Sequence, residues 1–256
     1  MLSAEYFDLL VQAMYALALL VFVCLYFVNA GYGQFRSQRW GWSVSNRWGW
    51  LLMEAPVFAV MLAIWLTSGR SLHAPEIVLF CLFELHYLQR SFVFPFLMSG
   101  KGRMPVAIML MGIVFNSING LLQGGALFWY PNPDYAEGAA YLLRTTTMLG
   151  VLLFFIGMGI NLHSDNVIRH LRQPGDTHHY LPDGGLYHWV TSANYFGELL
   201  EWTGFALAAA TPAAWVFPVW TAANLVPRAH AIHKRYCLEF GHQAVGKRKR
   251  IIPFIY

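Results

Sequence analysis

The chain has 256 residues, of which 57% are hydrophobic and 16% aromatic, and its formal net charge is +4. Charged residues make up 12% of it, against about 25% in an average soluble domain, and the mean hydropathy is +0.44. These values exclude an ordinary soluble enzyme. They predict a single all-α membrane domain over residues 1–256, with no room for a separate soluble domain.

Seven apolar segments are long enough to cross a hydrocarbon core of ~30 Å, which takes about 20 helical residues. In chain order they cover residues 10–28, 49–66, 75–98, 106–128, 141–160, 191–210 and 213–226. Acidic Glu5 and Asp8 precede the first segment, where a signal peptide carries basic residues. We therefore expect the first segment to remain in the mature protein as a span.

The positions of Lys and Arg predict the orientation, because short cytoplasmic loops carry an excess of both. With the N-terminus outside, 14 of the 17 basic residues fall on the cytoplasmic side. The sequence thus predicts a multi-pass protein with a cytoplasmic C-terminus, in the endoplasmic reticulum of a eukaryote or the inner membrane of a bacterium. We interpret the basic run at 247–250 as an anchor for anionic membrane lipid, and infer neither a nucleic acid nor an obligatory protein partner. The three cysteines are expected to be buried and form no metal motif.

One polar connection, residues 161–190, is predicted to be a cytoplasmic cofactor-binding loop. A structureless loop of about thirty residues is uncommon unless it has a function. Its arginines suit phosphate groups, and its Asp and Asn side chains suit hydroxyl or amide groups. We expect a lid, and the alternative is a solvated linker.

Ionisable residues inside apolar segments indicate a functional site, because a charge at membrane depth is costly. Glu84, Tyr87, Arg90 and Ser91 have the spacing of one helix face in the third segment. Similar spacing places Asn194, Glu198 and Glu201 on one face of the sixth, and His233 with Tyr236 on one face beyond the seventh if that helix continues. The pattern predicts a polar chamber toward the cytoplasmic side. The alternative is that these groups only bond neighbouring helices.

Several local motifs resemble those of a known family. They are Leu52-Met-Glu54-Ala-Pro56, His86-Tyr87-Leu-Gln-Arg90-Ser-Phe92, Gly157-Met-Gly159-Ile-Asn161-Leu-His163-Ser-Asp165, Gly184-Gly185-Leu186, Ala193-Asn194-Tyr-Phe-Gly197-Glu198, Glu201-Trp202 and Ile252-Pro253-Phe254. Together they resemble the steroid 5α-reductase family, most closely its type 2 enzymes, over nearly the whole chain. The family's seven spans agree with the topology counted above.

The resemblance implies NADPH-dependent reduction of the Δ4 double bond of a 3-oxo steroid or a sterol-like lipid. Glu54 and Tyr87 match the pair that holds the substrate's C3 carbonyl. The cofactor-contacting positions match Arg103, Asn161, Asp165, Arg172, Asn194, Glu198, Arg228 and Tyr236, and we add the neighbouring Arg90, His163, Arg169, Glu201 and His233 to the predicted set. The chain departs from the family at Ala231, Ile232 and Phe94.

The expected chemistry follows from the residue types. Hydride delivery to the β-carbon of an enone builds negative charge on the carbonyl oxygen, where the Tyr87 hydroxyl can donate a hydrogen bond. Glu54 is either a protonated second donor or an acceptor that orients Tyr87, since desolvation favours a neutral carboxyl group. The α-carbon then takes its proton from water.

The cofactor site is not expected to be a Rossmann site, because no GxGxxG follows a strand. We expect NADPH in the cytoplasmic half of the bundle, with Arg172 at its 2′-phosphate and Arg36, Arg39 and Arg103 as the next candidates. The nearest alternatives are a trans-2-enoyl-CoA or other sterol double-bond reductase and a membrane isoprenylcysteine or phospholipid methyltransferase. A di-iron oxygenase lacks its histidine boxes here, so no metal is predicted, and a lipid carrier is the non-enzymatic alternative.

Overall fold

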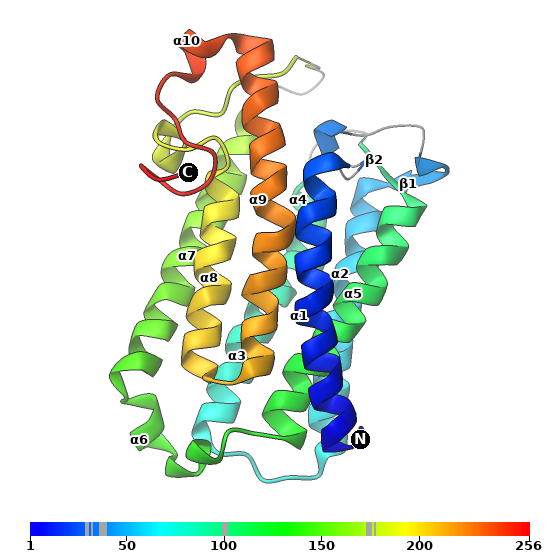
Figure 1. The fold of residues 1–256 in the computed structure, drawn as a ribbon, viewed down its shortest axis with the longest axis vertical. Helices are drawn as coiled ribbons and strands as arrows, with labels where there is room; N and C mark the ends of the chain where they lie inside the picture. Colours follow the sequence, from blue (N-terminus) through cyan, green and yellow to red (C-terminus); the bar gives the residue numbers. More distant parts are fainter. Residues whose placement is uncertain (29–30, 32, 36–39, 99–101, 173–175, 177) are drawn as a thin grey trace.

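The computed structural model describes residues 1–28, 31, 33–35, 40–98, 102–172, 176 and 178–256. Long helices lie side by side in a bundle with short connections at its two ends (Figure 1). The long helices are α1 (Ala4–Phe27), α2 (Asn46–Ser68), α3 (Ala74–Tyr87), α5 (Val106–Gly124), α7 (Thr145–His170), α8 (Ala193–Ala209) and α9 (Pro212–Phe240). The short elements are η1 (Gly33–Phe35), β1 (Ser43–Ser45), η3 (Leu88–Val93), α4 (Phe94–Leu97), β2 (Arg103–Pro105), η4 (Gly125–Trp129), η5 (Pro133–Glu137), α6 (Ala139–Leu142), η6 (Gly185–His188) and α10 (His242–Val245).

Among the described residues, five helical segments are long and apolar enough to cross a membrane. They are Ala4–Phe27, Asn46–Ser68, Ala74–Leu97, Val106–Trp129 and Thr145–His170, and they correspond to the first five predicted spans. The other two predicted spans are also helices, but α8 has 17 residues, and the second half of α9 carries basic and polar side chains. The helical fold is confirmed, with one small two-stranded sheet added, while seven spans and an outside N-terminus stay predictions.

Three predicted helix boundaries are wrong, and so is the predicted burial of two cysteines. The predicted loop at 161–190 begins too early, because α7 continues to His170, where its polar residues pack against α8 and keep the helical spacing. The same helix begins at Thr145, later than the predicted 141. α9 does not end at 226 but continues to Phe240. This is the condition under which His233 and Tyr236 were expected to share one helix face. Cys24 and Cys81 are exposed rather than buried, and both lie on helices that can face lipid.

Close approach at glycine sets the register of α7 and α8. A Cβ atom at Gly157 would overlap the backbone of α8, and a Cβ at Gly197 would lie 2.5 Å from the Asn161 nitrogen. Small residues allow membrane helices to approach this closely. Because the two helices run antiparallel here, the register brings the polar end of α7 against the polar start of α8.

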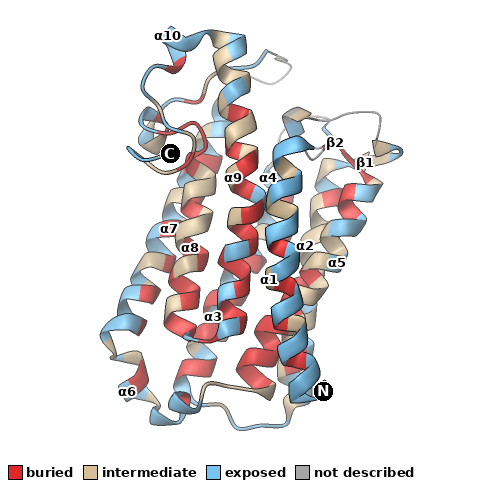
Figure 2. Cartoon of the chain, viewed as in Figure 1, coloured by how far each residue is buried: buried red, intermediate tan, exposed pale blue. Residues whose placement is uncertain are grey.

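The core of the bundle is aromatic and centres on Trp202, which is fully buried. The ring of Phe217 lies 4.2 Å from it between centroids, Phe83 lies at 5.6 Å and Phe154 at 6.2 Å. Figure 2 shows buried residues on the inner faces of α3, α8 and α9, and exposed residues along the outer faces of α1 and α7. Many of the exposed side chains are large and apolar, as expected for helices that contact lipid.

The two ends of the bundle differ in charge. The two-stranded sheet β1–β2, the end of α7, α10 and the C-terminus lie at one end, and the N-terminus lies at the other (Figure 1). We call the former the basic end, because its segments carry Arg103, Arg169, Arg172 and Lys247. In the sheet the two strands are antiparallel, with Val44 opposite Met104.

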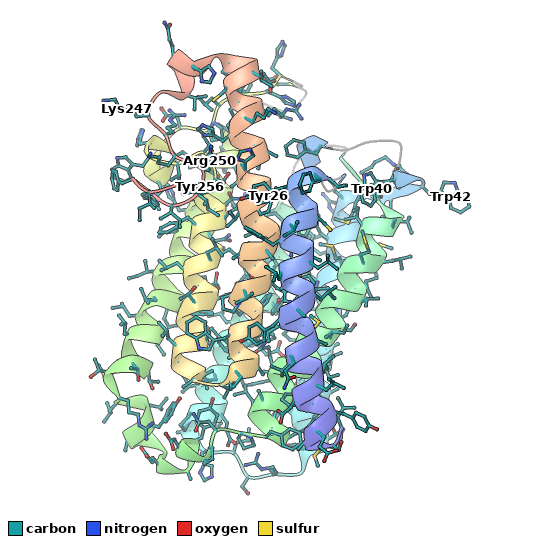
Figure 3. All side chains as sticks on the ribbon, viewed as in Figure 1. Tyr26, Trp40, Trp42, Lys247, Arg250 and Tyr256 are labelled. Atoms are coloured by element: carbon teal, nitrogen blue, oxygen red, sulfur yellow. The ribbon has the colours of Figure 1, made fainter. Side chains whose placement is uncertain are left out.

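The last ten residues form backbone hydrogen bonds with the connection between α7 and α8. The Lys249 N–H donates to the Trp189 carbonyl at 2.7 Å, and the Thr191 N–H donates to the Lys249 carbonyl at 2.9 Å. The Tyr256 hydroxyl lies 3.4 Å from that of Tyr26 on α1, and Figure 3 shows the two side chains facing each other beside α9. This part of the connection is therefore packed between the C-terminal segment and the bundle.

Candidate active site

Two asparagine side chains of α5 donate hydrogen bonds to the two predicted catalytic residues. The Asn116 amide donates to the Glu54 carboxylate at 3.1 Å, and the Asn119 amide donates to the Tyr87 hydroxyl at 3.4 Å. Asn116 and Asn119 are three residues apart and thus share one face of α5. Glu54 comes from α2 and Tyr87 from the end of α3, so one face of α5 contacts both of these consecutive helices.

The Asn119 side chain is itself held by Gln123, one turn further along α5. The Gln123 amide donates to the Asn119 side-chain oxygen at 3.3 Å and to the Ala213 carbonyl at 3.0 Å. Asn119, Gln123 and Tyr87 are all buried. Because the amide oxygen of Asn119 is already occupied by Gln123, its NH₂ group is the part that faces the Tyr87 hydroxyl.

Arg90 joins three helices at the next level of the bundle. It lies in the π-helical turn η3, with its guanidinium 3.4 Å from Asp165 on α7 and 3.9 Å from Glu198 on α8. Its guanidinium carbon is also 4.8 Å from the Trp50 ring centroid and 4.5 Å from that of Phe94. A purely α-helical face for Arg90 was therefore the wrong expectation. Such single π-turns are frequent at functional sites.

The polar ends of α7 and α8 form one hydrogen-bonded network. The Asn194 amide donates to Asp165 at 3.0 Å, and the Asn161 amide donates to the Asn194 carbonyl at 3.0 Å. The Tyr187 hydroxyl, from the connection between the two helices, donates to the Asn194 side-chain oxygen at 3.4 Å. Three of the predicted cofactor-binding residues are thus brought together.

Three predicted residues lie on the part of α9 beyond the last predicted span. Arg228 donates to the Tyr195 hydroxyl at 2.9 Å, and His233 lies 3.4 Å from the Thr191 hydroxyl. Burial first, then the Arg250 charge, lowers the pKa of His233, so its ring is neutral at pH 7. Burial raises the pKa of Tyr236 to about 12, so that its hydroxyl remains a donor at neutral pH.

The remaining predicted cofactor residues lie at the basic end. Arg103 donates to both the hydroxyl and the carbonyl of Ser43 across the two-stranded sheet, while Arg169 donates to Asn166 within α7 at 3.2 Å. His163 is exposed and packs against Gly185, at φ +56°, where a Cβ would overlap its ring. Arg172 is exposed just beyond the end of α7, and its charge acts on the partly buried Tyr236. Arg36 and Arg39 lie outside the described residues.

Two buried glutamates have surroundings that the sequence did not predict. The Glu201 carboxylate lies 2.7 Å from the Nδ1 atom of His86 on α3. Glu84 is buried, and neither carboxylate oxygen has a hydrogen-bond partner among the residues that the structure describes. Glu84 is therefore not part of the network around Arg90.

The sequence reasoning missed Asn116, Asn119 and His86. A signal existed for the two asparagines, because they recur at helical spacing with Gln123 in an otherwise apolar segment. His86 stands next to Tyr87 in a motif already singled out. Within the described part of the chain, no three His, Cys, Asp or Glu side chains are grouped so as to hold a metal ion.

Comparison with known proteins then identifies the family. Residues 102–256 match the family model described as 3-oxo-5-alpha-steroid 4-dehydrogenase. The chain belongs to this family. It is similar to 3-oxo-5-alpha-steroid 4-dehydrogenase 1 of Bos taurus, 37% identical over 244 residues (94% of this chain, 93% of the relative). The type 2 protein of Sus scrofa is 38% identical over 247 residues, 94% of each chain.

The family extends to plant relatives as well. Steroid 5-alpha-reductase DET2 of Gossypium hirsutum is 33% identical over 253 residues, 95% of each chain. The match to this 3-oxo-5-alpha-steroid 4-dehydrogenase family confirms the resemblance seen in the sequence. Both the type 1 and the type 2 relatives align with nearly all of the chain, so the segments around Glu54 and Tyr87 fall within the aligned lengths.

Proposed function

We propose that this protein reduces the Δ4 double bond of a 3-oxo-Δ4 steroid to the 5α-reduced 3-oxo steroid, with NADPH as the hydride source. Membership of the family supports the reaction class, an oxidoreductase acting on a CH–CH group. The observation that carries the proposal is the pairing of Glu54 and Tyr87 on one face of α5 through Asn116 and Asn119. It supports two hydrogen-bonding groups close together, the partly buried Glu54 and the buried Tyr87.

Tyr87 is proposed to polarise the C3 carbonyl. As negative charge develops on that oxygen during reduction, a hydroxyl aimed at it stabilises the transition state more than the ground state. The side chain is 2% exposed, and a hydrogen bond is stronger in such a low-dielectric place. Asn119 donates to the oxygen atom of the hydroxyl, which directs the hydroxyl proton away from α5 and toward the substrate.

Glu54 is proposed as the second contact to the carbonyl oxygen. Asn116 donates to its Oε2 atom, which leaves Oε1 for the substrate or for Tyr87. A protonated Glu54 donates to the carbonyl, whereas an ionised one accepts from Tyr87 and orients it. The two forms predict different results for the amide substitution described below.

The donor set at the basic end fits a dinucleotide phosphate. Arg172 at the end of α7 and Arg228 on α9 are the guanidinium groups for the phosphates, as arginine matches phosphate geometry well. Asn161 and Asn194 offer amide groups, and Tyr236 a protonated hydroxyl. NADPH, when bound, supplies the hydride. Arg90 keeps Asp165 and Glu198 in place between the two sites.

The substrate is proposed to be a steroid or sterol-like lipid that partitions into the membrane. The apolar outer faces of the helices and the five candidate spans support an integral membrane protein. We further propose the multi-pass orientation read from the basic residues, with the basic end and its cofactor contacts in the cytoplasm. NADPH then reaches its site from the aqueous side and the steroid from the lipid.

Tyr87→Phe tests the proposal most simply. Loss of one donor to a developing oxyanion typically lowers the rate ~10²- to 10³-fold, so turnover should fall by that order while the Kd for NADPH changes little. The measurement is single-turnover reduction with saturating NADPH, with cofactor binding measured on the same preparation. Unchanged turnover would remove Tyr87 from the carbonyl site.

Glu54→Gln then separates the two forms of the carboxyl group. An amide still donates, so a mild loss of turnover indicates a neutral Glu54, and a severe loss indicates an ionised one. Full activity with ordinary substrate affinity would make Glu54 structural. If the purified protein carried an S-adenosyl ligand instead of NADP(H), a methyltransferase would replace this proposal.

A further inference from the structure

Two polar side-chain contacts connect α3, and the π-turn η3 that follows it, to α8. Near the centre, His86 Nδ1 lies 2.7 Å from Glu201 Oε1. One turn toward the basic end, Arg90 lies 3.9 Å from Glu198. The lower residue number on one helix faces the higher number on the other, so the helices run antiparallel and the two contacts are successive rungs between them. Tyr87 lies between the rungs in sequence.

The contact between His86 and Glu201 is buried inside the bundle. The Glu201 side chain is 0% exposed and that of His86 is 6% exposed. The second carboxylate oxygen, Oε2, has no hydrogen-bond partner among the described residues. The hydrogen bonding of this carboxylate therefore rests on His86, and a buried group that loses its partner bears the full cost of its desolvation.

His86, held by Glu201, packs against the ring of the next residue, Tyr87. Its ring centroid lies 5.0 Å from that of Tyr87 in an edge-on arrangement, and 4.5 Å from that of Trp202. Trp202 in turn lies 5.8 Å from the Tyr87 ring. Both contacts are with the ring of Tyr87, whereas its hydroxyl faces Asn119 on α5. His86 and Trp202 thus contact the ring of Tyr87 and leave its hydroxyl to its other neighbours.

We propose that His86 and Glu201 are positioning residues for Tyr87. Glu201 fixes the position of the His86 ring. That ring packs against the ring of Tyr87, so it also sets the direction of the Tyr87 hydroxyl. The role differs from the cofactor contact first expected of Glu201. It rests on the proposed function of Tyr87, and it predicts that loss of Glu201 acts on the rate through Tyr87.

A double-mutant cycle of Glu201→Gln with Tyr87→Phe tests this role. A small misplacement of a reacting group can cost on the order of 100-fold, so Glu201→Gln alone should lower kcat roughly 10- to 100-fold, with KM for NADPH within about twofold. In the Tyr87→Phe background the same change should lower kcat by about twofold or less, because the hydroxyl that it misplaces is already absent. An equal loss of kcat in both backgrounds, or no loss in the first, would overturn the role.

Glu76→Gln is the matched control, because Glu76 is also a fully buried glutamate on this pair of helices and bonds Arg70 at 3.3 Å. It lies at the start of α3, far in sequence from Tyr87, and its effect on kcat should be the same in both backgrounds. If Glu201→Gln does not fold, His86→Gln replaces it, since its amide can still donate to Glu201. A fully active Tyr87→Phe would overturn the proposed function and this role together, whereas additive losses would overturn only the positioning role.

Discussion

Arg90 lies 3.4 Å from Asp165, and this ion pair joins the π-turn after α3 to the half of α7 nearer the basic end. The pair is enclosed, with the Arg90 side chain 15% and the Asp165 side chain 9% exposed. The guanidinium also contacts the rings of Trp50 and Phe94. The contact thus connects the proposed substrate pair on α2 and α3 with the proposed cofactor network on α7 and α8.

Substituting Arg90 should therefore cost much of the stability of the fold. Arg90→Gln leaves the buried Asp165 and the partly buried Glu198 without their cation, and removal of one partner of a buried pair costs about 3 to 5 kcal/mol. We expect a large drop in the midpoint of thermal unfolding in detergent. Arg144→Gln is the control, because Arg144 forms two ion pairs at the surface, where such pairs contribute little. Equal drops in the two variants would show that the Arg90 contacts do not carry this role.

Cofactor choice should depend on Arg172. A 2′-phosphate adds close to two negative charges, and charge-assisted bonds from an arginine are worth ~1.5 to 3 kcal/mol, or on the order of 10- to 100-fold. Arg172→Ala should raise the KM for NADPH by about that factor and leave the NADH reaction nearly unchanged. Arg103→Ala is the comparison, and should weaken both cofactors alike if it binds the shared pyrophosphate. Equal impairment of both cofactors by Arg172→Ala would refute the assignment.

Cofactor should protect the connection between α7 and α8. Its later part is already held by the C-terminal segment through Trp189 and Lys249, so protection is expected at its start, where Arg172 is exposed. Trypsin cleavage after Arg172 should slow when NADPH is added, because a closed lid shields the chain. Cleavage after Arg144, at the other end of α7, serves as the internal reference. The lid is contradicted if both sites are cut at unchanged relative rates.

Acidification should destabilise the fold through His233. Its pKa in the folded protein is lowered by burial and by Arg250, whereas an unfolded histidine has a pKa of about 6.5. Below pH ~6.5 the unfolded chain therefore binds more protons, so stability falls as the pH drops through this range. His233→Gln should flatten the fall in unfolding midpoint between about pH 7 and 5, and His170→Gln, at an exposed site on α7, should not. An identical slope in wild type and His233→Gln would contradict this.

Much of the helical arrangement could be predicted from the sequence, because apolar length sets where spans lie. The first five predicted segments match helices that are long and apolar enough to cross a membrane. The ends of the helices were harder to predict, because polar residues inside a helix resemble those of a loop. Asn161 and Asp165 were assigned to a loop on their polarity, yet they continue α7 because α8 offers them hydrogen-bond partners.

The partners of the site residues could not be predicted in the same way. The pairing of Glu54 with Asn116 and of His86 with Glu201 depends on helix register, which is set by close packing between helices rather than by local pattern. The direction of Arg90 depends on a π-turn, for which helical spacing gives no signal. Residue types thus predicted which groups matter, and packing determined which of them meet.

Hydride transfer to a steroid is the central claim, and isotope transfer tests it most directly. Purified protein would be incubated with a 3-oxo-Δ4 steroid and NADPH that carries deuterium at C4 of the nicotinamide, and the product analysed by mass and NMR spectroscopy. The account predicts a 5α-reduced 3-oxo steroid with one deuterium at C5, formed far more slowly by Tyr87→Phe. An unreduced steroid, a 5β product or deuterium at another carbon would contradict it.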